Sequence, residues 1–290
     1  MQKISFIILH YKTIQETIAC VNSIEKLISH EKCNIVVVDN GSNDESGNKL
    51  KELYEENENI YVLINSENLG FAQGNNIGYS FARENLQATF IAVINNDTII
   101  NDENFVTKFI NIYSIEKYHV LGPDVMTLEG IHQSPLAMNR ITLEEINYFL
   151  KNYKKESLMV KIKYILKKFF LFRYIKNRFF HKEQEQNENY KTKHEDVVLS
   201  GAFLIFSPDF VKKEKEAFYP GTFMYVEEFI LFHLCHQKKY KVLYTPDLYI
   251  LHKHEASTKN DLKSFFKKTD FFYHHVAQGY LILKKIMEND

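Results

Sequence analysis

Short apolar runs alternate with segments of helical periodicity through the first third of the chain. Four runs have strand length and end abruptly at polar clusters; they cover residues 4–9, 35–38, 60–64 and 89–94. The segments between them, residues 13–27, 44–56 and 71–83, have helical character. Strands that alternate with helices predict parallel pairing with right-handed crossovers. The pattern therefore predicts an α/β fold with a Rossmann-like, mostly parallel sheet and helices on both faces.

The rest of the chain is less regular. Helical character is expected over residues 143–182, 227–235 and 264–287, the last as one helix or a helix pair. Strand character returns over residues 197–206 and 242–244, and the polar residues 181–194 are expected to form a loop. Neither an internal repeat nor a low-complexity linker interrupts the sequence. We therefore expect one domain over residues 1–290 with an embedded helical insertion.

Composition narrows the class of protein. The 290 residues are 45% hydrophobic and 25% charged, which allows a sizeable core and argues against wholesale disorder. The formal net charge of -1 argues against a general nucleic-acid binder. Three cysteines at wide spacing form neither a disulfide framework nor a zinc motif, so we expect a reducing, cytoplasmic environment. No signal peptide or membrane-spanning run is expected.

One segment of the chain is strongly basic although the chain as a whole is nearly neutral; we call residues 151–182 the basic island. Residues 151–182 carry eleven Lys and Arg and a single acid, Glu156. Within the island an apolar face is predicted at helical spacing, with Lys161, Lys163, Lys167 and Lys168 mostly opposite; the face comprises Leu158, Ile162, Ile165, Leu166 and Phe169, extended by Met159 and Phe170. Such a helix suits an anionic membrane surface. The alternative is that the apolar face packs on the core or on a second subunit in a homodimer.

Polar clusters follow two of the predicted strands directly. Asp39 begins the turn that ends the second strand, and Asn95, Asn96 and Asp97 end the fourth. Ligands of open parallel sheets bind at the carboxyl ends of the strands. Asp97 can offer a carboxylate to Mg²⁺ or Mn²⁺, and Asp39 can accept hydrogen bonds from a base or a ribose. Taken singly, either cluster is also ordinary turn chemistry.

Three further segments could carry chemistry. Residues 68–76 combine two glycines with several amides at a strand-to-helix junction, where a helix start can approach a phosphate. Glu227 and Glu228 lie among aromatic residues and could hold a raised pKa suited to a general base. His252 follows a strand and could ligate a metal. A glycine loop, a solvated helix start and a structural histidine are the respective alternatives.

Read in order, these pieces resemble the family 2 glycosyltransferases, and most closely the bacterial rhamnosyltransferase-like branch. The matching stretches cover most of the chain outside the basic island; they are Ile8–Tyr11, Val36–Ser42, Asn65–Gly78, Val93–Thr98, Leu199–Phe203, Tyr225–Glu228 and His252–Thr258. The resemblance implies a GT-A fold, a nucleotide-sugar donor, a divalent cation (Mg²⁺ or Mn²⁺) and inversion at the anomeric carbon. It also implies a saccharide or lipid-linked saccharide acceptor and a role in cell-surface polysaccharide assembly.

The resemblance assigns roles residue by residue. Glu228 matches the catalytic acid of the family's Glu-Asp pair, with Glu227 beside it. Asp97 matches the last acid of the metal-binding Asp-x-Asp motif, and His252 matches a histidine near the diphosphate. The matched stretches also supply the donor-binding candidates, which are His10, Tyr11, Asp39, Asn68, Gly70, Asn75, Asn96 and Gly201. On this basis residues 1–125 form the nucleotide-sugar-binding half, residues 126–258 the acceptor-binding half with its insertion at 143–195, and residues 259–290 a C-terminal helical segment.

Departures from the family pattern concern the acceptor side. Glu replaces Asp at position 228, Ile230 stands where many relatives carry a further acid, and the basic residue usual a few positions later is absent. These changes leave open a degenerate, non-catalytic protein that binds a membrane or partner. A nucleotidyltransferase is a further alternative, but the segment from His10 to Thr13 lacks the glycine-rich loop which that class usually carries near its first strand.

Overall fold

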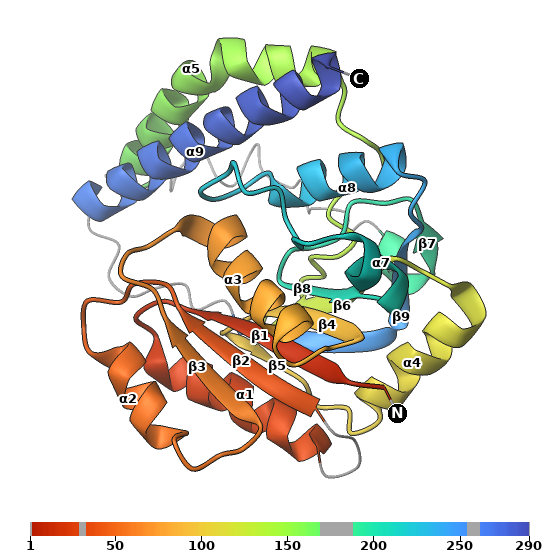
Figure 1. The fold of residues 1–290 in the computed structure, drawn as a ribbon. Coiled ribbons are helices and arrows are strands. Elements are labelled where there is room, and N and C mark those ends of the chain that lie inside the picture. Colours follow the sequence, from red (N-terminus) through yellow and green to blue (C-terminus); the bar gives the residue numbers. More distant parts are fainter. Residues whose placement is uncertain (1, 29–32, 169–187, 254–261, 290) are drawn as a thin grey trace.

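The computed structural model describes residues 2–28, 33–168, 188–253 and 262–289, which form a nine-stranded sheet with flanking helices (Figure 1). The strands are β1 (Ile4–His10), β2 (Cys33–Asp39), β3 (Ile60–Ile64), β4 (Phe90–Asn95), β5 (Thr98–Ile99), β6 (Val120–Thr127), β7 (His194–Glu195), β8 (Phe203–Phe206) and β9 (Val242–His252). The helices are α1 (Ile14–Ile28), α2 (Ser46–Leu53), α3 (Gly70–Glu84), α4 (Phe105–Glu116), α5 (Leu143–Lys168), η1 (Glu188–Lys191), α7 (Pro208–Lys213), α8 (Glu227–Gln237) and α9 (Leu262–Glu288).

The sheet has the order β3-β2-β1-β4-β8-β6-β9-β5, with β7 also paired to β9. The strands β3, β2, β1 and β4 pair in parallel, as predicted. Beyond them β8 runs antiparallel to both β4 and β6, while β6 and β9 are parallel to each other. The predicted mostly parallel α/β sheet is therefore confirmed, with a mixed second half.

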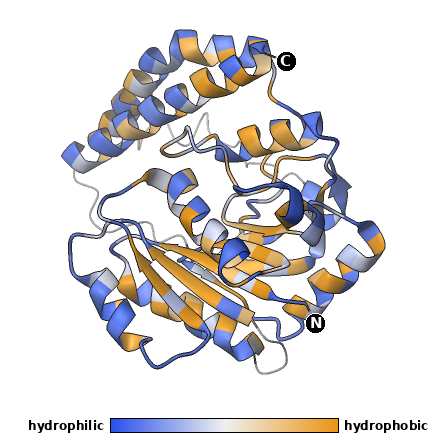
Figure 2. Ribbon diagram, viewed as in Figure 1, coloured by the Kyte–Doolittle hydropathy of each residue, from blue (hydrophilic) through white to orange (hydrophobic). Residues whose placement is uncertain are grey.

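Alternating side chains of the strands build one core on each face of the sheet. On β1, Phe6 and Ile8 point into a core shared with α1, α2 and α4, whereas Ile7 points into a core shared with α3, α7 and α8. The same alternation continues along β2 and β4, which are mostly hydrophobic (Figure 2). Strands that are buried on both faces need continuous apolar runs, which is why the sequence pattern reveals them. Helices on both faces are confirmed.

Several elements differ from the sequence prediction. The strand expected over residues 197–206 is limited to β8, because residues 200–202 form a turn before it, and the strand expected at 242–244 extends to His252. The C-terminal segment is a single helix, α9. Helix α4 and strand β6 were not anticipated. The sequence of β6 contains Gly122, Pro123 and Asp124, which read as turn residues, yet the strand is held between β8 and β9.

Helices α5 and α9 lie side by side and run antiparallel above the rest of the molecule (Figure 1). Phe149 of α5 packs on Tyr280 of α9, and Tyr164 stacks on Phe265. A third core joins this pair to α8 through Ile146, Ile230 and Leu283, among other residues. The pair thus rests on the start of α8 rather than on the sheet.

Helix α5 exposes part of the apolar face predicted for the basic island instead of packing it on the core of the chain. Leu158, Met159 and Ile162 are 58%, 45% and 45% exposed, so they do not pack on the core. Lys161 instead lies against α9, where its ammonium pairs with Asp270. Within the described residues, none of the helices is long and apolar enough to cross a bilayer. Residues 169–182 of the island lie outside the described part of the chain.

Close packing of α3 on the sheet generates a stability prediction. A Cβ added at Gly78 would lie 2.4 Å from Cγ2 of Ile7 and 2.9 Å from Cγ2 of Val38. We expect Gly78→Ala to lower the free energy of unfolding by about 1–3 kcal/mol, because overpacking outweighs the gain of roughly 1 kcal/mol in helix propensity. Urea unfolding measures it, with Ser80→Ala on the same helix as the control. A net stabilisation by Gly78→Ala would contradict the close approach.

Candidate active site

One edge of the sheet collects the polar residues of both halves of the chain. The carboxyl ends of β2, β4 and β9 bring Asp39, Asn95 and His252 to this edge. Because β8 is antiparallel to β4, its amino-terminal end reaches the same edge, where the Asn95 N–H donates to the Ala202 carbonyl at 2.9 Å. Segments more than a hundred residues apart in sequence therefore meet at one place.

A cavity of about 530 Å³ lies at this edge. Four predicted site residues line it, namely Gly201, Glu227, Glu228 and His252. Asp97 adjoins it, because His252 Nε2 lies 3.0 Å from Asp97 Oδ1. Residues that were not predicted as site residues also line the cavity; they include Phe71, Asn95, His132, Gln133 and Tyr225. We refer to this cavity as the strand-end cleft.

Glu227 and Glu228 lie in the first turn of α8, and the backbone directly before them is strained. Tyr225 and Val226, directly before them, both have left-handed backbone angles, with φ of 71° and 72°. For a β-branched residue such as Val226 this conformation costs about 1–2 kcal/mol. Gly279 of α9 leaves room for the turn, since a Cβ there would lie 2.8 Å from Val226 Cβ. Packing of α9 thus holds the turn that aims the two carboxylates.

The two carboxylates have unusual protonation behaviour. Burial raises the pKa of Glu227 to about 8, and the neighbouring charge of Glu228 adds to this shift. Glu227 is 3% exposed, and its Oε1 has no hydrogen-bond partner among the described residues. Burial also raises the pKa of Glu228, although hydrogen bonds from its own backbone N–H and from that of Gly201 partly offset the effect. A raised pKa makes a deprotonated Glu228 a stronger base.

Gly201, a predicted donor-binding residue, lies directly against Glu228. A Cβ at position 201 would lie 2.3 Å from Glu228 Oε1. Only a glycine lets the turn before β8 approach this carboxylate and donate its N–H to it. The close contact fixes the position of Glu228 relative to the end of β4.

Asp97 and His252 form the candidate metal pair. The Asp97 side chain is 26% exposed, and the other ring nitrogen of His252, Nδ1, lies 2.6 Å from Gln133 Oε1. Within the described residues no three His, Cys, Asp or Glu side chains are grouped to hold a metal ion. One carboxylate and one imidazole nevertheless fit a cation that takes its remaining ligands from water and a substrate diphosphate, as Mg²⁺ usually does. The residues present are thus compatible with a substrate-bridged cation.

Several donor-binding candidates lie behind the surface of the sheet edge. The His10 ring is fully buried, with Nδ1 2.7 Å from Thr17 Oγ1 and Nε2 2.8 Å from Ser46 Oγ. Burial lowers the pKa of His10, opposed by the charge of Asp39. Asp39 is 1% exposed and accepts a hydrogen bond from the Ser42 N–H at 3.1 Å. A direct contact of His10 or Asp39 with a ligand would require this packing to open.

The remaining candidates mostly fix loops. Asn96 donates to the hydroxyls of Thr13 and Thr17 at 2.7 and 3.0 Å. Asn68 accepts from the Gly70 N–H at 2.9 Å, which closes the turn into α3. Asn75 is buried, and its Oδ1 has no partner among the described residues.

Two candidates differ from this group. Tyr11 is 40% exposed, with the Lys12 ammonium 4.8 Å from its ring centroid, so it is accessible for stacking on a base. Gly70 has a φ of +81° and lies against Phe223, because a Cβ there would be 2.2 Å from the Phe223 carbonyl oxygen. The Phe71 N–H donates to the same oxygen at 2.6 Å. The start of α3 is therefore tied to the segment that leads into Glu227.

His132 and Gln133 were missed because the sequence gives no reason to place them. They follow β6, whose own sequence reads as a turn, so nothing in the pattern indicated that residues 132 and 133 return to a strand end. The Gln133 N–H donates to the Val125 carbonyl at 2.7 Å, which folds this segment back along β6. Backbone pairing, rather than local sequence, brings both side chains to the cleft.

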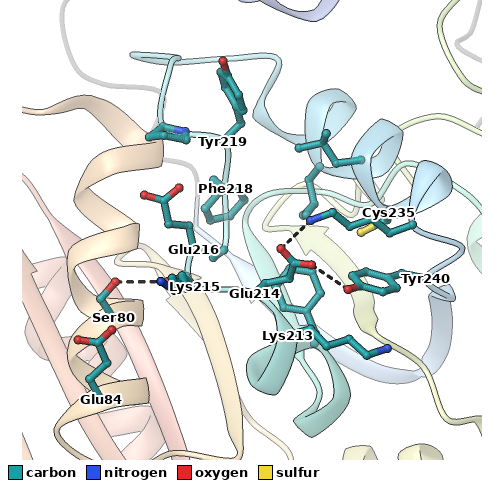
Figure 3. Close-up of a pocket in the computed structure, with 16 residues that line it drawn as sticks. Ser80, Glu84, Lys213, Glu214, Lys215, Glu216, Phe218, Tyr219, Cys235 and Tyr240 are labelled. Carbon is teal, nitrogen blue, oxygen red and sulfur yellow. Dashed lines mark hydrogen bonds and ion pairs between the residues drawn. The ribbon is translucent and has the colours of Figure 1, made fainter. Parts of the chain in front are cut away.

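A second hollow of about 650 Å³ lies away from the cleft, between α3, the segment after α7 and the end of α8 (Figure 3). The Glu214 carboxylate in this hollow accepts hydrogen bonds from the Lys238 ammonium at 2.6 Å and from the Tyr240 hydroxyl at 2.8 Å. Both carboxylate oxygens therefore have a hydrogen-bond donor. None of the site residues predicted from the sequence lines this hollow.

Comparison with known proteins identifies the family of the chain. The sequence family described as Glycosyl transferase family 2 matches residues 5–213. Over 137 residues the chain is 27% identical to the low-salt glycan biosynthesis hexosyltransferase Agl10 of Haloferax volcanii, which covers 47% of this chain and 41% of that protein.

Solved structures share the fold. The structure of S. aureus TarS 1–349 in complex with UDP-GlcNAc superposes with a TM-score of 0.54 and 15% identity, covering 94% of this chain and 65% of that one. GalNAc-T7 with UDP, GalNAc and Mn²⁺ gives a TM-score of 0.58 and 14% identity, covering 90% and 46%. The chain thus spans less than two thirds of each of these proteins. The shared architecture is the GT-A fold expected from the sequence.

The raised pKa of Glu227 predicts a pH-dependent stability. Between the ordinary value of 4.5 and about 8, the folded protein keeps a proton that the unfolded chain has lost, so stability falls as pH rises through this window. Glu227→Gln cannot ionise and removes that loss. We expect it to stabilise the protein by roughly 2–4 kcal/mol more at pH 8 than at pH 5. Urea unfolding at both pH values measures it, with the exposed Glu52→Gln as control; a difference independent of pH would contradict the assignment.

Proposed function

The chain belongs to glycosyl transferase family 2, and on that premise we propose that it is an inverting, cation-dependent glycosyltransferase which moves a sugar from a nucleotide-sugar to an acceptor hydroxyl. One observation carries the proposal: Glu227, Glu228 and His252 line one cavity, the strand-end cleft, and His252 lies beside Asp97. A base and a diphosphate site within one cavity are what a direct displacement requires. We assign residues 1–125 to donor binding and residues 126–258 to acceptor binding.

In the proposed reaction Glu228 accepts the proton of the acceptor hydroxyl as its oxygen attacks the anomeric carbon. A new C–O bond forms on the face opposite the nucleoside diphosphate, the bond to the diphosphate oxygen breaks, and the leaving group takes that electron pair. The configuration therefore inverts. The Gly201 N–H holds the carboxylate in place, and Glu227, largely protonated below pH 8, adds no second negative charge. A positioned general base typically contributes about 10²–10⁴-fold to the rate.

We assign the cation, Mg²⁺ or Mn²⁺, to Asp97 and His252. When bound, it would neutralise charge on the departing diphosphate. TarS has been solved with UDP and with UDP-GlcNAc, and GalNAc-T7 with UDP, GalNAc and Mn²⁺, which supports a nucleotide-sugar donor and a divalent cation for this chain. Tyr11, Asp39, Asn68, Gly70, Asn75 and Asn96 belong in the proposal to the nucleotide side, with His10 as a buried support. For the sugar we propose a hexosyl or rhamnosyl group, used in cell-surface polysaccharide assembly.

Exposed residues of α5 support a membrane contact on the acceptor-binding half. Leu158, Met159 and Ile162 are exposed on α5, and Lys155 and Lys163 beside them are exposed as well. Apolar side chains flanked by lysines on an exposed helix suit the boundary of an anionic bilayer. We propose that this surface rests on the cytoplasmic face of a membrane and that the acceptor is a lipid-linked saccharide.

The competing function is a non-catalytic relative that only binds a membrane or a partner. Incubation with a panel of nucleotide-sugars (UDP-glucose, UDP-N-acetylglucosamine, dTDP-rhamnose and GDP-mannose), with and without Mn²⁺, separates the two. Transfer, or slow release of nucleoside diphosphate from one donor that stops with chelator, supports the enzyme. Membrane binding without binding or turnover of any donor supports the non-catalytic alternative.

Glu228→Gln tests the base. The amide keeps the size of the side chain and an oxygen for the Gly201 N–H, but it cannot take up a proton. We expect turnover to fall by about 10²–10⁴-fold while donor affinity stays within about twofold. Steady-state transfer and calorimetric donor binding measure the two quantities. Turnover near that of the wild type would move the role of base to Glu227 or to another group.

Asp97→Ala tests the cation site. Removing the carboxylate should abolish the Mn²⁺-dependent part of donor binding without changing the melting temperature, because the side chain is partly exposed. Calorimetry with and without chelator gives the metal-dependent part. Asp102→Ala, which removes an acid paired with Lys108 on the surface, is the matched control. If the donor affinity of Asp97→Ala still depends on Mn²⁺, the metal lies elsewhere.

Flotation with liposomes tests the membrane surface. The wild type should float with vesicles containing anionic phosphatidylglycerol and not with pure phosphatidylcholine, since each lysine near an anionic surface contributes about 1 kcal/mol. Leu158→Glu combined with Ile162→Glu should abolish flotation. Ile115→Glu, which replaces an 81% exposed residue of α4, is the control. Equal recovery on both vesicle types contradicts the proposal, and concentration-dependent dimerisation lost in the double variant would assign the surface to a homodimer instead.

A further inference from the structure

His132 and Asp124 form an oriented pair beside the strand-end cleft. The Nδ1 atom of His132 lies 2.9 and 2.8 Å from the two oxygens of the Asp124 carboxylate. Their side chains are 16% and 10% exposed. Because an ionised carboxylate only accepts hydrogen bonds, Nδ1 must carry the proton that it shares with Asp124. The orientation and the protonated nitrogen of this ring are therefore both fixed.

Stacking fixes the plane of the same ring. The rings of His132 and Tyr190 are parallel within 7°, with centroids 3.5 Å apart. The Tyr244 hydroxyl donates to the Tyr190 carbonyl at 2.7 Å, which anchors the tyrosine to β9. One edge of the imidazole is thus held by Asp124 and one face by Tyr190. The second nitrogen, Nε2, has no hydrogen-bond partner among the described residues, and the ring lines the cleft.

The position of His132 in the cleft indicates which group it meets. Its neighbour Gln133 contacts His252, the candidate cation ligand, and Glu228 lines the same cavity. On the proposed function, the transferred sugar must lie between the diphosphate and the base. A ring fixed next to the diphosphate side therefore faces the sugar of the donor rather than the acceptor.

We propose that His132, held by Asp124 and Tyr190, is a specificity residue whose Nε2 hydrogen-bonds a hydroxyl of the donor sugar. This inference rests on the proposed function and adds to it a residue that recognises the sugar itself. A hydroxyl both donates and accepts, so Nε2 binds it whether or not it carries a proton. A buried polar group that loses its partner is costly, so this contact discriminates against sugars that lack a hydroxyl at the matching position.

The test compares each nucleotide-sugar with its own nucleoside diphosphate. Calorimetry with Mn²⁺ uses UDP-N-acetylglucosamine against UDP, UDP-glucose against UDP, dTDP-rhamnose against dTDP and GDP-mannose against GDP. His132→Phe combined with Asp124→Asn removes Nε2, keeps a ring for Tyr190 and strands no buried carboxylate. His132→Gln returns a polar group without the ring. The matched control is His119→Phe, which alters a second parallel histidine–tyrosine stack, with Tyr240, outside the cleft.

For the donor that the wild type uses, we expect the double variant to bind the nucleotide-sugar about tenfold more weakly and the nucleoside diphosphate within about twofold of wild type. His132→Gln should recover part of the loss, and His119→Phe should change neither affinity.

A parallel loss for both ligands means that the pair is structural and overturns the proposal. Unchanged donor affinity with reduced transfer assigns the hydroxyl to the acceptor and also overturns it. If the wild type binds and transfers while all variants match it, only this inference fails; if the wild type binds no nucleotide-sugar and no diphosphate, the proposed function fails and this inference fails with it.

Discussion

The antiparallel insertion of β8 between β4 and β6 is the constraint on which the arrangement of this molecule depends. A purely parallel sheet would bring only carboxyl ends of strands to the ligand edge. Reversal of β8 delivers its amino-terminal turn, residues 200–202, to that edge directly beside Asn95. The turn then carries Gly201 to Glu228, so that the two halves of the chain share one cavity. Without that reversal, the turn before β8 would lie at the opposite edge of the sheet from the end of β4.

Holding two adjacent acids at such a place has an energetic cost that the surroundings offset. Val226 adopts a left-handed conformation, Glu227 is buried with one oxygen unpartnered, and burial raises the pKa of both glutamates. The offsetting contacts come from α9, where Gly279 accommodates the turn and His275 stacks on Phe223 at 4.9 Å. The C-terminal helix therefore does more than cover the molecule, since it packs on the segment that positions the catalytic candidates. Its pairing with α5 links that segment to the exposed surface proposed to meet a membrane.

Sequence reasoning recovered the parallel half of the fold because those strands are buried on both faces and read as continuous apolar runs. It selected Glu227, Glu228, Gly201 and His252 mainly through the resemblance to a family, since spacing alone relates none of them, and all four line one cavity of the structure. It failed at β6, where Gly122, Pro123 and Asp124 suggest a turn but pairing to β8 and β9 imposes a strand. Because β6 was not predicted, His132 and Gln133 were not predicted as site residues either. Their place in the cleft depends on the pairing of β6 with strands distant in sequence. The sequence could not predict the orientation of α5 either, because Lys161 faces α9 and pairs with Asp270, which is more than a hundred residues away in sequence.

The central claim is that the strand-end cleft binds the diphosphate and its cation between Asp97 and His252. A crystal structure of the protein soaked with Mn²⁺ and UDP-N-acetylglucosamine, or with the donor that the panel identifies, tests it through the anomalous difference map at the manganese edge. The account predicts one strong peak within coordination distance of an Asp97 carboxylate oxygen and of His252 Nε2, with the diphosphate as its bridge to the cleft. A peak in the hollow lined by Glu214 and Tyr240, or a diphosphate bound away from Asp97, would contradict it.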